Sequence, residues 1–426
     1  MLRHRVREVC DAVMDGAGRD QPVEDVARRF ERTWQELAPI GRDPSTGGYR
    51  RCAWTAADAE LRAWFEQRAA ERGMTCVADR NGNLWAWEGE PADGAVVTGS
   101  HLDSVPDGGA FDGPLGVVSA FLAVDELRAQ GVVPARPLAV VAFADEEGAR
   151  FGVACAGSRL LTGALQPERA RALRDADGTS LAEAMTAAGA DPLALGRDDE
   201  ALRRIAAYVE LHVEQGRGLV HADAPIGVAT SIWPHGRWRL RFQGAADHAG
   251  TTRLEDRRDP VLPFATTALA ARDLAARAGA LATFGRVQVR PNGTNAVAAG
   301  VDAWLDARAP AETPLTELVE AITAAAGTAA EAHGTTVEVT RESWSPEVAF
   351  DDDLRARLRR VLGDVPELPT GAGHDAGVLA AHVPTAMLFV RNRTGVSHSP
   401  AEQADLDDCV AGVRALADVL EELACR

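Results

Sequence analysis

Residues 95–116 read AVVTGSHLDSVPDGGAFDGPLG. The first six form an apolar run typical of a buried strand, and the run ends at His101. After a glycine-rich turn, Asp112 and a glycine precede Pro114, which suits the first turn of a helix. Apolar residues then recur at helical spacing from residue 115 to residue 127. A strand leading through a polar connection into a helix is the repeating unit of an α/β sheet.

Two further apolar runs end in polar residues. Residues 137–144 read PLAVVAFA and lead directly into Asp145, Glu146 and Glu147, and residues 205–212 end at His212. Because open α/β sheets bind ligands at the carboxyl ends of their strands, we expect these side chains at one common edge. Adjacent side chains point apart on an extended strand, so Glu146 and Glu147 are expected to have different tasks.

A second pattern begins near residue 230, where GRWRLRFQG alternates apolar residues with arginines and predicts a strand with one buried face. The segments that follow are predicted as a helix (259–279), two strands (282–289 and 301–308), a helix (314–332) and a strand (335–340). This is the ferredoxin-like order, βαββαβ. We therefore predict an α/β fold with a mixed central sheet in residues 1–229 and 342–426, interrupted by an inserted ferredoxin-like module in residues 230–341. The last part contains a helix (352–362), a strand (385–391) and a C-terminal helix from about Pro400.

Composition narrows the possible partners. The 426 residues carry 45 basic and 63 acidic side chains, a net charge of −18, which disfavours nucleic acid or an anionic membrane as the main partner. The chain has no lysine, which excludes a lysine-dependent phosphate loop and a pyridoxal Schiff base. The six scattered cysteines fit a reducing compartment. The N-terminal segment 1–16 reads as a charged amphipathic helix and lacks the apolar core of a signal peptide, so we expect a cytoplasmic protein.

Several of the polar strand ends suit a metal site. His101 and Asp112 stand eleven residues apart across a glycine-rich turn that allows the chain to fold back. Such a pair alone is commonly a surface turn, but Glu147, His212 and His398 occupy comparable positions in the α/β pattern. Histidines with carboxylates are ligands for zinc or a similar divalent ion. Five residues suffice for two ions if one carboxylate bridges them, and Asp112 is the natural bridge.

Six motifs carry a resemblance to a known family: HLDSVPDGGAFDG, DEEGARF, LHVEQG, DHAGTT, GAGHDA and GVSHSPAE. In this order they closely resemble the hydantoinase/carbamoylase family of amidases. That family includes allantoate amidohydrolases, N-carbamoyl-L-amino-acid hydrolases and β-ureidopropionases, and it is a branch of the dinuclear zinc aminopeptidase-like hydrolases. The resemblance spans about residues 95–402.

The resemblance implies two divalent metal ions per subunit, with zinc first and manganese, cobalt or nickel as alternatives. The implied ligands are His101, Asp112 as the bridge, Glu147, His212 and His398. It also implies that the carboxylate of Asp103 accepts a hydrogen bond from the imidazole of His101. Glu146 matches the general base, which takes a proton from the attacking water and passes it to the leaving nitrogen.

The resemblance further implies a homodimer and a small substrate that carries a carboxylate. His248 would reach into the neighbouring subunit and stabilise the oxyanion, so the inserted module would serve as lid and dimerisation domain. Asn295 and Arg308 would bind the carboxylate, for which a guanidinium fork is well suited. Gln215 and His374 match positions that contact polar atoms of the substrate.

The expected activity is hydrolysis of a linear, non-peptide C–N bond in allantoate or an N-carbamoyl-L-amino acid, with release of ammonia. One alternative keeps the metal chemistry but acts on an N-formyl or N-formimidoyl amino acid or a dipeptide, and the identity of the products separates the two. An alternative of another class is a non-catalytic metal-binding dimer, which would show no metal-dependent turnover of any amide.

Overall fold

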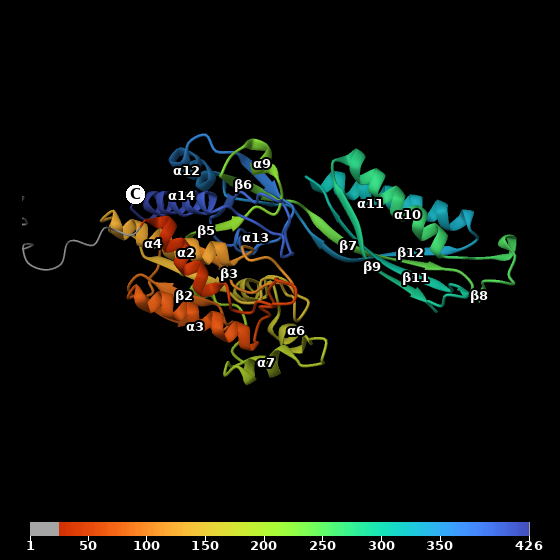
Figure 1. The fold of residues 1–426 in the computed structure, drawn as a ribbon, viewed down its shortest axis with the longest axis horizontal. Coiled ribbons are helices and arrows are strands. Elements are labelled where there is room, and N and C mark those ends of the chain that lie inside the picture. Colours follow the sequence, from red (N-terminus) through yellow and green to blue (C-terminus); the bar gives the residue numbers. More distant parts are fainter. Residues whose placement is uncertain (1–24, 426) are drawn as a thin grey trace, which may run out of the picture.

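The computed structural model describes residues 25–425, which form a larger and a smaller part joined along the long axis of the molecule (Figure 1). The helix expected in residues 1–16 lies outside the described residues. None of the helices within 25–425 combines the length and apolar character needed to cross a membrane. The expected cytoplasmic location stays a prediction.

A mixed sheet of nine strands, all within the described residues, forms the centre of the larger part. Across the sheet the strands are β1 (Thr75–Ala78), β2 (Leu84–Trp87), β4 (Leu138–Phe143), β3 (Ala95–His101), β5 (Ile205–Val213), β15 (Thr385–Val390), β6 (Ile226–Ile232) and β13 (Val348–Ala349), and β14 (Glu367–Thr370) also pairs with β6. The central strands β4, β3, β5 and β15 are parallel, and the outer β1, β2, β6 and β13 pair antiparallel. β3, β4 and β15 are buried along their whole length, and their sequences are accordingly mostly apolar. The predicted α/β class with a mixed central sheet is confirmed.

Helices cover both faces of this sheet. Val96 belongs to a buried cluster that also contains residues of α2 (Val26–Leu37), α3 (Ala56–Glu71), α4 (Pro114–Ala129) and α14 (Leu406–Cys425). Its neighbour Val97 belongs to a second cluster, with residues of α5 (Ala156–Thr162), α8 (Asp199–Arg204) and α13 (Asp375–Leu379). Successive side chains of the strand therefore point into the hydrophobic cores on opposite faces of the sheet. The remaining helices of this part are α6 (Pro167–Ala172), α7 (Leu181–Ala187), α9 (Gly218–Ala222) and α12 (Asp352–Leu362).

One helix boundary was predicted wrongly. The C-terminal helix begins at Leu406 and not near Pro400, because the intervening residues form a loop. That loop carries His398 and Glu402 against the edge of the sheet where the candidate site lies.

The smaller part is a four-stranded antiparallel sheet with two helices on one face (Figure 1). Its elements are β7 (His235–Gln243), α10 (Val261–Ala278), β9 (Leu281–Arg290), β11 (Gly300–Arg308), α11 (Glu312–Ala332) and β12 (Thr336–Ser345), with the strand order β12-β7-β11-β9. This is the βαββαβ arrangement expected from the sequence. As the alternation on β7 predicts, Trp238, Leu240 and Phe242 lie in the core against the helices.

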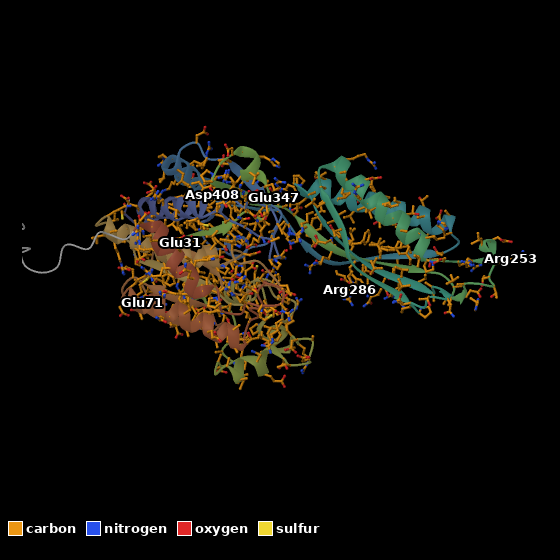
Figure 2. The ribbon with its side chains drawn as sticks, in the orientation of Figure 1. Glu31, Glu71, Arg253, Arg286, Glu347 and Asp408 are labelled. Carbon is orange, nitrogen blue, oxygen red and sulfur yellow. The ribbon has the colours of Figure 1, made fainter. Side chains whose placement is uncertain are left out.

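A short extension projects from the end of the smaller part. It contains the two-stranded sheet of β8 (Asp247–His248) and β10 (Ala296–Val297) and a short helical turn η1 (Leu254–Asp256). Figure 2 shows Arg253 at this end of the molecule, far from the large sheet. The domain boundaries at 229/230 and 341/342 stay predictions, and the observed elements nearest to them are β6 and β12, which end at Ile232 and Ser345.

Candidate metal centre

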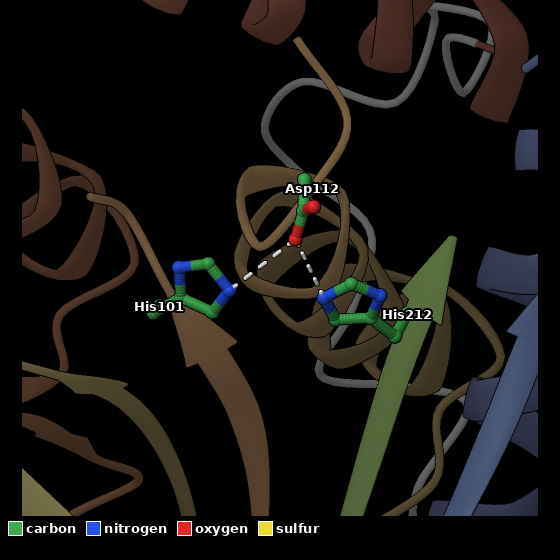
Figure 3. Close-up of side chains that lie close together, drawn as sticks. All are labelled: His101, Asp112 and His212. Carbon is green, nitrogen blue, oxygen red and sulfur yellow. Dashed lines mark ion pairs between the residues drawn. The ribbon is translucent and has the colours of Figure 1, made fainter. Parts of the chain in front are cut away.

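Three buried side chains meet at the carboxyl edge of the large sheet (Figure 3). His101 ends β3, His212 lies near the end of β5, and Asp112 precedes α4. The Nε2 atoms of His101 and His212 lie 3.7 and 3.2 Å from Oδ1 of Asp112. Neither Nε2 atom has a hydrogen-bond partner. Unpaired buried polar atoms are costly, so two imidazole nitrogens converging on a carboxylate fit a divalent cation.

The second oxygen of Asp112 faces another group of ligands. Nε2 of His398 lies 3.5 Å from Oδ2 of Asp112 and 3.4 Å from Oε2 of Glu147. Oε1 of Glu147 is buried without a hydrogen-bond partner. The side chain of His398 is 51% exposed, so the site is open to solvent on this side. Asp112 thus lies between two groups of potential ligands, as a bridging carboxylate must.

The backbone fixes the ring nitrogens that face the cluster. Nδ1 of His101 lies 3.1 Å from the carbonyl oxygen of Asp103, and Nδ1 of His212 lies 2.9 Å from that of Val213. A carbonyl accepts only from a protonated nitrogen, so in the neutral rings the lone pair is on Nε2. Burial alone would raise the pKa of Asp112, but His212, His101 and His398 hold it well below its usual range. Asp112 is therefore ionised.

Asp103 contacts His101 with both its backbone and its side chain. Nδ1 of the imidazole lies 3.1 Å from the backbone carbonyl of Asp103 and 3.5 Å from Oδ1 of its carboxylate, with which it forms an ion pair. The carboxylate also accepts the backbone N–H groups of Glu146 and Glu147, at 3.1 and 3.0 Å. These two glutamates lie in a turn after β4, not on extended backbone, and Asp145 there has φ 54°. Asp103 therefore holds this turn beside His101.

Glu146 faces the cluster from the side of His101. Its Oε2 lies 3.7 Å from Nε2 of His101, and its Oε1 accepts a weak hydrogen bond from the thiol of Cys155 at 3.3 Å. Burial raises the pKa of Glu146 well above the usual range of a carboxyl group. Burial and then Asp112 raise the pKa of Glu147 to about 8. The two glutamates make different contacts, as expected, because Glu147 faces His398.

Two predicted substrate-binding residues lie beside the cluster. The amide of Gln215 donates to Oδ2 of Asp112 at 2.8 Å and to Oγ of Ser397 at 2.9 Å. The ring centroids of His374 and His212 are 4.5 Å apart. Neither ring nitrogen of His374 has a hydrogen-bond partner. Burial lowers the pKa of His374 well below its usual range, so its ring is neutral and offers one donor and one acceptor.

The other three predicted residues are divided between the two ends of the smaller part. Arg308 ends β11 next to the larger part, where its guanidinium donates to the carbonyl of Gly371. His248 and Asn295 lie at the opposite end, where the N–H of Ala249 donates to the carbonyl of Asn295. The eight residue steps of β11 separate these ends by about 26 Å. Within one chain, His248 and Asn295 are thus remote from the metal cluster.

The sequence reasoning missed several buried residues of the site. Glu210 lies two residues before His212 on the same face of β5, where its carboxylate accepts from the hydroxyl of Ser100 at 2.7 Å. The period of two along a strand was a signal that could have identified it. Glu402 ends the motif GVSHSPAE, but the motif by itself did not indicate its contact with the distant loop of Asp112. Nothing in the local sequence marks Cys155, because its contact with Glu146 arises from the fold.

Comparison with known proteins identifies relatives over almost the whole chain. The sequence profile of peptidase family M20/M25/M40 matches residues 97–422. An N-carbamoyl-L-amino acid amidohydrolase from Geobacillus stearothermophilus is 39% identical over 404 residues, 92% of this chain and 98% of the relative. An allantoate amidohydrolase from Escherichia coli (strain K12) is 33% identical over 409 residues, 93% of this chain and 97% of the relative. The crystal structure of an amidase of the hydantoinase/carbamoylase family from Burkholderia multivorans aligns with a TM-score of 0.83 and 32% identity, covering 94% of this chain and 98% of that one. The chain therefore belongs to peptidase family M20/M25/M40, and within it to the hydantoinase/carbamoylase amidases.

Proposed function

We propose that the protein is a dinuclear metal-dependent amidohydrolase that cleaves a linear, non-peptide C–N bond in a small ureido compound with a carboxylate. The substrate is an N-carbamoyl-L-amino acid or allantoate, the compounds named in the two relatives, and ammonia is released. The observation that carries the proposal is the position of Asp112 between two groups of ligands, with Glu146 beside one of them.

The side chains of the cluster fit two divalent ions. His101 and His212 would hold one ion, Glu147 and His398 the other, and Asp112 would contact both. Zinc suits this set of nitrogen and oxygen donors, and manganese, cobalt and nickel accept it too. Such ions would polarise the scissile carbonyl and lower the pKa of water.

Glu146 is the residue proposed to move the proton. It is buried beside His101, with one oxygen facing the cluster and the other held by Cys155. A general base takes the proton of the attacking water in the first step, and the same group returns it to the leaving nitrogen in the second.

Two subunits are needed to complete the substrate site. Arg308 lies at the junction with the larger part and supplies a planar cation for the substrate carboxylate. His248 and Asn295 project from the far end, so they would serve the site of a second copy in a two-fold dimer. In this arrangement the smaller part, residues 230–341, is both lid and dimerisation domain.

The test is ammonia release after reconstitution with zinc or manganese. The panel contains allantoate, N-carbamoyl-amino acids, N-formimidoylglutamate, N-formylglutamate and a dipeptide, with a chelated control and amine formation followed in parallel. Ammonia from a ureido compound, lost with the chelator, is the expected result. Amine without ammonia would assign the protein to acyl or peptide hydrolysis, and no metal-dependent turnover of any compound would contradict the proposed activity.

A further inference from the structure

The loop before the C-terminal helix contacts the loop that carries Asp112. Glu402 is 6% exposed, and its Oε1 accepts the backbone N–H groups of Phe111 and Asp112 at 2.6 and 3.0 Å. These residues are about 290 positions apart in the chain. One oxygen of this buried side chain thus holds the N–H groups of two successive residues, which would otherwise be left without partners. Glu402 therefore fixes the backbone at the bridging residue.

The contact between the two loops leaves no free space. A Cβ atom placed on Gly109 would lie 2.5 Å from Cβ, Cδ and Oε1 of Glu402. Real Cβ atoms essentially never approach other atoms this closely, so only glycine allows the backbone to lie against Glu402. The position of the Asp112 loop thus depends on the side chain of Glu402.

The same C-terminal loop also holds the side chain of Asp112. The hydroxyl of Ser397 donates to Oδ2 of Asp112 at 2.9 Å, next to the amide of Gln215. His398, a predicted ligand of the second ion, lies between Ser397 and Glu402 in the chain. One loop of six residues therefore provides a ligand and holds the bridge at both its backbone and its carboxylate.

Glu402 is distinct from the predicted ligands in its contacts. Its Oε1 accepts two backbone N–H groups. Its Oε2 is buried without a hydrogen-bond partner, but Glu402 belongs to none of the groups of closely spaced metal-ligating atoms found within residues 25–425. We propose that Glu402 is a positioning residue that places Asp112 between the two metal ions. This inference rests on the metal centre proposed above.

The experiment compares Glu402→Ala, Glu402→Gln and Asp79→Ala in the full-length protein. Asp79 is a matched control, because its carboxylate also accepts two backbone N–H groups, of Asn81 and Asn83, but in a turn outside the cluster. Zinc dissociation constants are measured by competition with a chelating dye, and melting temperatures are measured without metal. We expect Glu402→Ala to weaken zinc binding about 10–100-fold. Glu402→Gln keeps an oxygen acceptor and should restore binding, and Asp79→Ala should lower only the melting temperature.

Each result has a definite meaning. If the wild type binds zinc and Glu402→Ala binds it equally tightly, the inference is overturned and the metal centre stands. If the wild type binds no divalent ion, the metal centre itself fails, and the inference fails with it. If Glu402→Ala does not fold, zinc binding is measured instead with Gly109→Ala. The new methyl group of that variant must move the loop of Asp112 away from Glu402. Unchanged zinc binding by that variant would equally overturn the inference.

Discussion

Complementation between two inactive variants tests whether His248 acts across a dimer interface. In one chain Arg308 ends β11, a strand about 26 Å long, and His248 lies beyond the opposite end of that strand, farther than a histidine side chain can span. Every active site should therefore combine Glu146 of one subunit with His248 of the other. Glu146→Gln should lower turnover by about 10²–10⁴-fold through loss of the base. His248→Ala should lower it by about 10²–10³-fold through loss of an oxyanion donor.

The expected recovery follows from the two-fold symmetry of the dimer. A heterodimer of the two variants has one site with both residues intact and one site with neither. Purified heterodimers should therefore have about half of the wild-type activity, and an equal mixture of freely exchanging subunits about a quarter, because half of its dimers are heterodimers.

The assay uses the two variants with different affinity tags, expressed together and purified over both tags. Native mass spectrometry verifies the heterodimer, and ammonia release gives the activity. The control pairs Glu146→Gln with the double variant Glu146→Gln/His248→Ala, which forms no intact site. Verified heterodimers with only background activity would show that His248 does not act in the neighbouring site.

Three further predictions concern single sites. Glu146→Gln should keep the wild-type metal content by mass spectrometry while losing turnover, and full activity would contradict its role as the base. Arg308→Ala should raise KM for the substrate about 10–100-fold through loss of a charged hydrogen bond, and an equal loss with an amide that lacks the carboxylate would contradict that contact. Burial, and then Glu210, raise the pKa of Asp375 from 3.8 to about 8. The melting temperature of chelated protein should therefore fall between about pH 5 and pH 8, because the folded chain holds a proton that the unfolded chain has lost. By calorimetry Asp375→Asn should show a smaller fall, and an identical fall would exclude Asp375 as a source.

The order of the elements and the predicted ligands were readable in the sequence because they depend on local patterns. A strand buried on both faces is mostly apolar, so charged or imidazole side chains at or just after its end, such as His101 and Glu147, are easily recognised. The alternation on β7 likewise marked the inner face of the smaller sheet, because side chains on a strand point to opposite faces in turn. The motifs around these residues also indicate the family.

Contacts between distant segments could not be read in this way. Asp103 holds the turn of Glu146 with its carboxylate, and Glu402 holds the loop of Asp112 across about 290 residues. The separation of His248 from Arg308 follows from their places at opposite ends of the smaller part. Local periodicity specifies which residues form a strand or helix and which face is buried. The packing order of the strands and the paths of the loops specify which backbone donors and side chains meet, because those contacts exist only after the chain has folded.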